Sequence, residues 1–82
     1  MIQRTTSYVL EDIVKAIDAI EKFTLNMDFE TFANDEKSIR AVERELEIIG
    51  EAVKKLPDTL TRNYPQIHWR AVAGMRDRLI HH

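Results

Sequence analysis

The sequence predicts an all-α fold, an up-and-down helical bundle of about three main helices, on three observations. Apolar residues recur at intervals of three and four along most of the chain, which is the spacing of amphipathic helices. No alternating strand pattern, internal repeat or low-complexity tract is present in the sequence. The chain has 82 residues, 44% hydrophobic and 32% charged, which suits one small domain. We therefore expect a single helical domain over residues 1–82.

The first main helix is expected near residues 5–25. Its apolar residues follow one helical face: Val9, Ile13, Ile17, Ile20 and Phe23. A hydroxyl of Thr5, Thr6 or Ser7 is expected to cap its first turn. The stretch NMDFETFANDEK then interrupts the pattern with residues that favour turns and caps: Asn26, Asp28, Asn34 and Asp35. Within this stretch, FETF predicts a short turn of helix.

The second main helix is expected near residues 35–56. Its apolar residues form a narrow stripe, typical of a helix packed along another: Ile39, Val42, Leu46, Ile49, Val53 and Leu56. Gly50 in mid-helix costs about 1 kcal/mol relative to alanine, so we interpret it as room for another backbone. Pro57 is expected to end the helix.

The third main helix is expected near residues 67–81, after a segment between Pro57 and Pro65 with room for at most a short helix. Trp69, Val72 and Leu79 lie on its apolar side by helical spacing. Across the three helices we expect eight mostly buried residues: Ile13, Ile17, Ile20, Val42, Leu46, Ile49, Val53 and Leu79.

The charge of the chain is divided along its length. Residues 1–61 carry eight Lys or Arg against thirteen Asp or Glu, a net charge of −5. Residues 62–82 carry four arginines against Asp77 alone, a net charge of +3, and all three histidines. Such a local basic cluster on an acidic chain suits binding of a phosphate group at one place. Solvated charges at helix ends are the alternative interpretation.

Several classes of site are excluded by composition. The chain has no cysteine, so it has no disulfide and no thiolate zinc site. It has no glycine-rich phosphate loop and no HExxH pattern, and the adjacent His81 and His82 diverge by about 100° on a helix. We therefore expect no metal and no cofactor. We also expect a cytoplasmic protein with no membrane segment, because no apolar run has the length of a signal peptide or a membrane span.

The candidate catalytic residues are Arg76, Asp77 and His81. Asp77 and His81 are four apart, so on a helix the carboxylate could orient the imidazole. Arg76 and His81 diverge by roughly 140° around a helix, so a second copy of the chain is the natural way to complete the site. A core this small, without disulfides, also favours self-association.

Three long stretches and one motif resemble a known family: YVLEDIVKAIDAIEKFT, MDFETFANDEKSIRAVERELEIIGEAVKKLP and PQIHWRAVAGMRDRLIHH. The chain is similar to the HepT-like ribonucleases, HEPN-domain toxins encoded beside MNT-type minimal nucleotidyltransferase antitoxins. The family motif has an arginine, a polar residue, a histidine four to six residues after the arginine, a variable residue and a tyrosine. Arg76, Asp77, His81 and His82 match its first four elements.

The resemblance implies the toxin of a type VII toxin–antitoxin system, a metal-independent endoribonuclease that acts as a homodimer. His81 would be the general acid or base, Arg76 would stabilise the phosphate and Asp77 would orient the imidazole. Arg78 and Arg70 are further candidates for RNA-phosphate contacts. The partner nucleotidyltransferase would inactivate the toxin by adding AMP to the motif tyrosine.

The motif tyrosine would be residue 83, and the family continues with a further C-terminal helix. We therefore expect a HEPN-like domain incomplete at its C-terminal end, with weak or no activity in the 82-residue form. Two other functions stay open. The chain could be a non-catalytic subunit that binds nucleotide or substrate for the nucleotidyltransferase, or an interaction module that acts through its helix surfaces.

Overall fold

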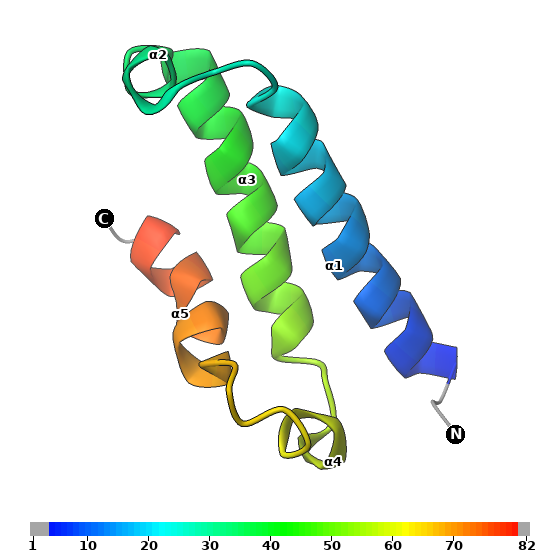
Figure 1. Ribbon diagram of the computed structural model, residues 1–82. Helices are drawn as coiled ribbons and strands as arrows, with labels where there is room; N and C mark the ends of the chain where they lie inside the picture. The colour runs from blue at the N-terminus through cyan, green and yellow to red at the C-terminus, as the bar shows by residue number, and fades with distance from the viewer. Residues whose placement is uncertain (1–3, 81–82) are drawn as a thin grey trace.

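The computed structural model describes the backbone of residues 4–80 and the side chains of residues 4–75. The described backbone contains five helices and no strand, which confirms the all-α class (Figure 1). The helices are α1 (Arg4–Phe23), α2 (Phe29–Ala33), α3 (Glu36–Val53), α4 (Asp58–Thr61) and α5 (Trp69–Ile80). The three long helices agree with the three predicted main helices.

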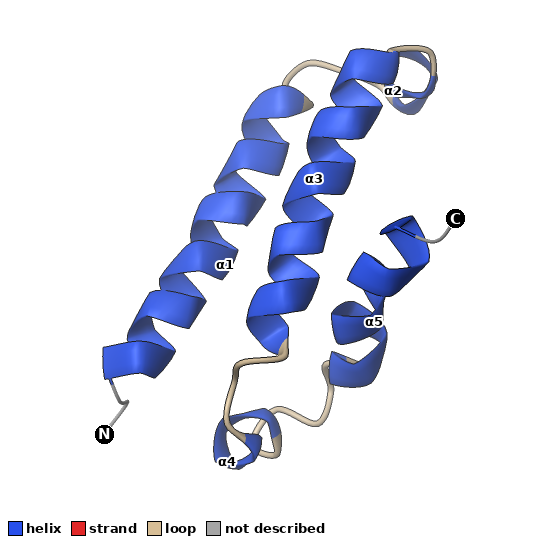
Figure 2. Cartoon of the chain, turned by 180° about the vertical axis from the view of Figure 1, so that it is seen from behind, coloured by secondary structure: helices blue, strands red, loops and turns tan. Residues whose placement is uncertain are grey.

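Helix α3 is the centre of the bundle and packs against both α1 and α5. Figures 1 and 2 show α1 and α5 on opposite sides of α3, with successive long helices running in opposite directions. The short helices α2 and α4 lie at the two ends of α3 and reverse the chain there. This is the predicted up-and-down arrangement, with α3 as the shared support.

The first helix differs from prediction at its start and agrees at its end. The backbone is already helical at Arg4, so the predicted cap by Thr5, Thr6 or Ser7 is wrong. Thr6 is instead buried within the helix. After the helix, Asn26 adopts φ 61°, the left-handed conformation that asparagine tolerates better than most residues. The predicted turn therefore forms at that residue.

Asp28 and Asp35 lie at the N-cap positions of α2 and α3, as predicted, and of the two only Asp28 caps its helix through its side chain. Asp28 Oδ1 accepts a hydrogen bond from the backbone N–H of Thr31 at 2.8 Å and caps α2. Asp35 Oδ2 accepts one from the hydroxyl of Ser38 at 2.7 Å, at the start of α3. Hydrogen bonds from Thr31 lower the pKa of Asp28, and the Ser38 hydroxyl lowers the pKa of Asp35. Both carboxylates are thereby stabilised in their ionised form.

The end of α3 also differs from prediction. The helix ends at Val53, short of Pro57, which was expected to end it. Pro57 is instead the extended residue before α4, with ψ 148°. The helix keeps Gly50 buried in its last turns, where the missing side chain leaves room for a neighbouring helix.

The buried core is thin. Five hydrophobic residues of the described part are buried: Val9, Ala16, Ala52, Val53 and Leu56. Of the predicted core, Val53 is buried and five residues are half-buried: Ile13, Ile20, Val42, Leu46 and Ile49. The prediction for Ile17 is wrong, because its side chain is 43% exposed. Ala16 is seven residues after Val9 and faces α3 with it, which turns Ile17 about 100° away. The side chain of Leu79 lies outside the described residues.

None of the helices that the structure describes is both long enough and apolar enough to cross a membrane.

We expect Leu56→Ala to lower the free energy of unfolding by about 2–5 kcal/mol, because it leaves a cavity where Leu56 is 7% exposed. Leu25→Ala is the matched control, since Leu25 is 71% exposed and its loss should change stability by less than about 0.5 kcal/mol. Urea unfolding followed by far-ultraviolet circular dichroism measures both. Equal losses in the two variants would contradict this core.

Candidate functional site

Helix α5 carries most of the residues predicted to form the site. Arg70 is in its first turn and is exposed. Arg76, Asp77 and Arg78 are in its second half, where the structure describes the backbone but not their side chains. His81 lies outside the described residues. The structure therefore places four of the five predicted residues on one helix and leaves the contact between Asp77 and His81 a prediction.

Trp69 fixes where α5 begins. Its ring packs against the buried core together with Val72 and Ala73 from the same helix. Its indole Nε1 donates hydrogen bonds to the backbone carbonyls of Thr61 and Tyr64, at 3.0 and 3.1 Å. The two bonds join the first residue of α5 to the end of α4 and the loop after it. The helical pattern predicted the apolar face of Trp69 but not this bond. The only sign of it in the sequence is that a part-buried indole N–H needs an acceptor.

Helical spacing relates the exposed start of α5 to the predicted catalytic half. Arg70 and Asp77 are seven residues apart, so they lie on the same face of the helix, about 10 Å apart along its axis. Arg76 is one residue before Asp77 and lies about 100° around the helix. Within one copy of α5, Arg76 is thus off the face that carries Arg70 and Asp77.

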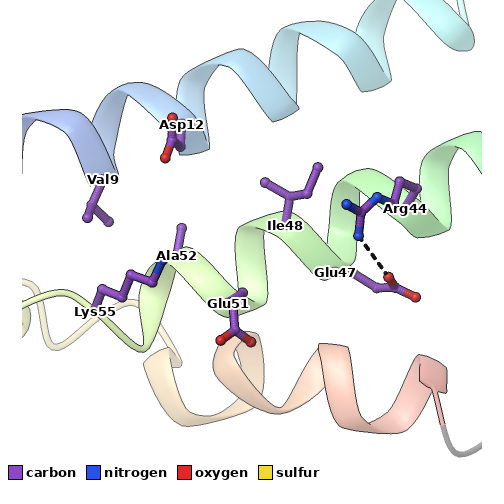
Figure 3. A pocket seen from close by; sticks show the side chains of 8 residues that line it. All are labelled: Val9, Asp12, Arg44, Glu47, Ile48, Glu51, Ala52 and Lys55. Atoms are coloured by element: carbon purple, nitrogen blue, oxygen red, sulfur yellow. Dashed lines mark hydrogen bonds and ion pairs between the residues drawn. The ribbon is translucent and has the colours of Figure 1, made fainter.

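A pocket of about 200 Å³ lies elsewhere, between α1 and α3 (Figure 3). It is lined by Val9, Asp12, Arg44, Glu47, Ile48, Glu51, Ala52 and Lys55. The lining contains acidic, basic and apolar side chains, and Arg44 forms an ion pair with Glu47 at 3.4 Å. None of the predicted site residues lines it. The described residues contain no group of three or more side chains able to hold a metal ion.

A second, open hollow lies at the start of α5 and is lined by His68, Trp69, Arg70 and Ala71. Unlike the pocket between α1 and α3, it includes a predicted phosphate-binding residue, Arg70. His68 and Arg70 are both exposed there. His68 and Arg70 therefore border an open hollow at this end of the bundle.

Comparison with known proteins covers nearly the whole chain. A family model described as "Ribonuclease HepT-like" matches residues 13–82. The protein named "Probable ribonuclease HepT" from Thermococcus cleftensis is 51% identical over 79 residues, which are 96% of this chain and 72% of that protein. "Putative RNase MJ0127" from Methanocaldococcus jannaschii is 48% identical over 73 residues, which are 89% of this chain and 60% of that protein. No solved structure matches the chain.

We expect Trp69→Phe to lower the free energy of unfolding by about 0.5–1.5 kcal/mol, because it removes the donor shared by the Thr61 and Tyr64 carbonyls and keeps an aromatic ring. Amide hydrogen exchange should also become faster in residues 61–69. Tyr64→Phe is the control, because it keeps the backbone carbonyl that accepts the bond. If exchange were unchanged in Trp69→Phe, the indole would not hold this segment.

Proposed function

Because the chain belongs to the HepT-like ribonuclease family, we propose that it is a metal-independent endoribonuclease, the toxin of a type VII toxin–antitoxin system acting in the cytoplasm. The observation that carries the proposal is the extent of the family match, which runs through residues 13–82 and includes Arg76, Asp77 and His81. These are the residues that match the family motif. Arg76 and Asp77 lie on α5, the helix that also carries exposed Arg70, which supports the same assignment.

The proposed reaction is attack of a ribose 2′-hydroxyl on the adjacent phosphate. A new bond forms between the 2′-oxygen and phosphorus while the bond to the 5′-oxygen breaks, which leaves a cyclic phosphate and a free 5′-hydroxyl. His81 takes the proton of the nucleophile or gives one to the leaving oxygen, and two copies of His81 would divide these roles. Arg76 stabilises the negative charge of the pentacoordinate phosphate, and Asp77 orients the imidazole. DNA is not cut, because it lacks the nucleophile.

We propose a homodimer as the active form. Arg76 and His81 diverge around one helix, so two copies of α5 facing one cleft would bring together an arginine from one chain and a histidine from the other. The thin core supports association, and so does the exposed flank of α1, where Val14 and Ile17 are 55% and 43% exposed. A partner that covered this flank would bury apolar surface that the bundle leaves in water.

The proposed regulatory partner is the cognate MNT-type nucleotidyltransferase, as in the family. The alternative function is a non-catalytic subunit that binds nucleotide or substrate for that enzyme. In that case the arginines of residues 62–82 would bind phosphate and His81 would be dispensable. The two functions differ in whether His81 is required, so one substitution distinguishes them.

The first test is cleavage of a single-stranded RNA, in the presence of a chelator, by the chain extended with the family's motif tyrosine and C-terminal helix. We expect cleavage without added metal, and a loss of about 10²-fold or more in rate for either Arg76→Ala or His81→Ala. His82→Ala is the matched control, since His82 occupies the variable position of the motif. The corresponding DNA should stay intact.

Each result has a defined consequence. Unchanged cleavage by His81→Ala, or cleavage that requires a divalent ion, would contradict the mechanism. RNA binding without any cleavage by the extended wild-type chain would favour the non-catalytic alternative. Circular dichroism of each variant checks that helical content is retained.

A second test concerns association through the flank of α1. We expect a reversible dimer in sedimentation equilibrium, and we expect Val14→Asp to weaken it about ten-fold or more, because an unpaired carboxylate is costly to bury. Lys15→Asp introduces the same group about 100° around the helix and should have a smaller effect. A wild-type chain that stays monomeric and folded at micromolar concentration would rule out the dimer.

A further inference from the structure

We propose that the corner between α4 and α5 is a contact surface for single-stranded RNA, formed by Arg62, Tyr64, His68 and Arg70. The inference rests on RNA being the substrate, as proposed above, and adds a binding surface outside the catalytic motif. It assigns two kinds of contact. The arginines bind phosphates, and the aromatic rings of Tyr64 and His68 stack on bases.

All four side chains are accessible. Arg62, His68 and Arg70 are exposed, and Tyr64 is 49% exposed. They lie within nine consecutive residues that turn from the end of α4 into the first turn of α5 (Figure 1). His68 and Arg70 line the open hollow at the start of α5. The corner thus combines cationic and aromatic groups, the combination used by surfaces that bind single strands.

The charge of this segment is of one sign. No Asp or Glu occurs between Asp58 and Asp77 in the sequence, whereas residues 1–61 carry a net charge of −5. RNA phosphates would therefore be repelled by most of the chain and attracted to residues 62–82. Arg62 and Arg70 are the arginines of that segment whose side chains the structure describes.

The corner is held in one conformation before any ligand binds. The Trp69 indole bonds the carbonyls of Thr61 and Tyr64, which flank Arg62. The backbone N–H of Ile67 donates to the Tyr64 carbonyl at 3.1 Å, which closes the loop after Tyr64. Leu60 and Trp69 both pack against the buried core. A loop whose backbone is already ordered loses less entropy when it binds, so this loop is suited to recognition.

One residue of the corner, Arg70, lies in line with one residue of the proposed site, Asp77. Arg70 shares a helical face with Asp77, about 10 Å along the axis of α5. A strand bound at the corner would therefore reach the catalytic half of the helix within a few nucleotides. The inferred role of the corner is to hold the RNA on one side of the phosphate that is cleaved.

The opposite end of the bundle exposes apolar and acidic residues, and the comparison favours RNA over a protein as the partner at the α4–α5 corner. The exposed residues Leu25 and Phe29, 71% and 83% accessible, lie there beside Asp28 and Glu30. An apolar and acidic surface of that kind suits a protein partner. The α4–α5 corner is basic and aromatic instead, which favours RNA.

The test is binding of a fluorescein-labelled, 2′-O-methylated oligouridine, measured by fluorescence anisotropy. The 2′-O-methyl groups remove the nucleophile, so the wild-type chain binds this probe without cleaving it. We expect Tyr64→Ala to weaken binding by about five-fold to a hundred-fold, the effect of losing one base stack. We expect Arg62→Gln to lower the slope of log affinity against log salt by about 0.7, the effect of losing one phosphate contact to a single strand.

Two exposed residues at the other end of the bundle provide matched controls. Phe29→Ala removes an aromatic ring and Arg40→Gln removes an arginine that pairs with Glu36 at 3.1 Å. Both controls should bind the probe as tightly as the wild-type chain. Circular dichroism of all four variants checks that they are folded.

The outcomes separate this inference from the proposed function. Corner variants that bind like the wild-type chain, or a wild-type chain that fails to bind the probe, would overturn the RNA contact. Unchanged binding by the corner variants would favour a protein as the partner at the corner. Cleavage of unmodified RNA would in that case still support the ribonuclease. Conversely, loss of binding in the corner variants, with no RNA cleavage by the extended wild-type chain, would support the corner and refute the ribonuclease.

Discussion

The indole of Trp69 is the contact on which the position of α5 depends. It joins three parts of the chain, because its ring packs on the buried core while its N–H bonds the backbone at Thr61 and Tyr64. Both carbonyls also accept backbone bonds, that of Thr61 from the N–H of Tyr64 and that of Tyr64 from the N–H of Ile67, so the indole adds a link from α5 to a loop that is already turned. This one side chain thus ties the start of α5 to the corner beside it.

The thin core connects stability to assembly. Helix α3 has a partner on two sides, but much of the apolar surface on α1 faces away from it, and residues such as Val14 and Ile17 stay accessible. Small bundles gain little from burial inside one chain, so a second copy would add both apolar contact and the missing half of the site. In this proposal a second copy of the chain both covers exposed apolar surface and pairs an arginine of one copy with a histidine of the other.

The basic segment of the chain and the family motif both lie in residues 62–82. The acidic helices α1 and α3 would repel RNA, while the segment from Arg62 onward would attract it. The family motif lies in the same segment, so proposed binding and proposed catalysis occupy one helix and the loop before it. This arrangement explains how a chain with a net charge of −2 could act on a polyanion.

The sequence by itself determined the all-α class, the spans of the long helices and the cap residues Asp28 and Asp35, because periodicity and capping act over a few neighbouring residues. It also predicted Arg76, Asp77 and His81 as site residues, through their match to a family motif. Only the tertiary structure decided that Ala16 rather than Ile17 faces α3 and that Trp69 bonds the α4–α5 loop. Burial and such bonds depend on which helix flanks meet. That choice is made by the packing of the whole chain, so a short stretch of sequence does not contain it.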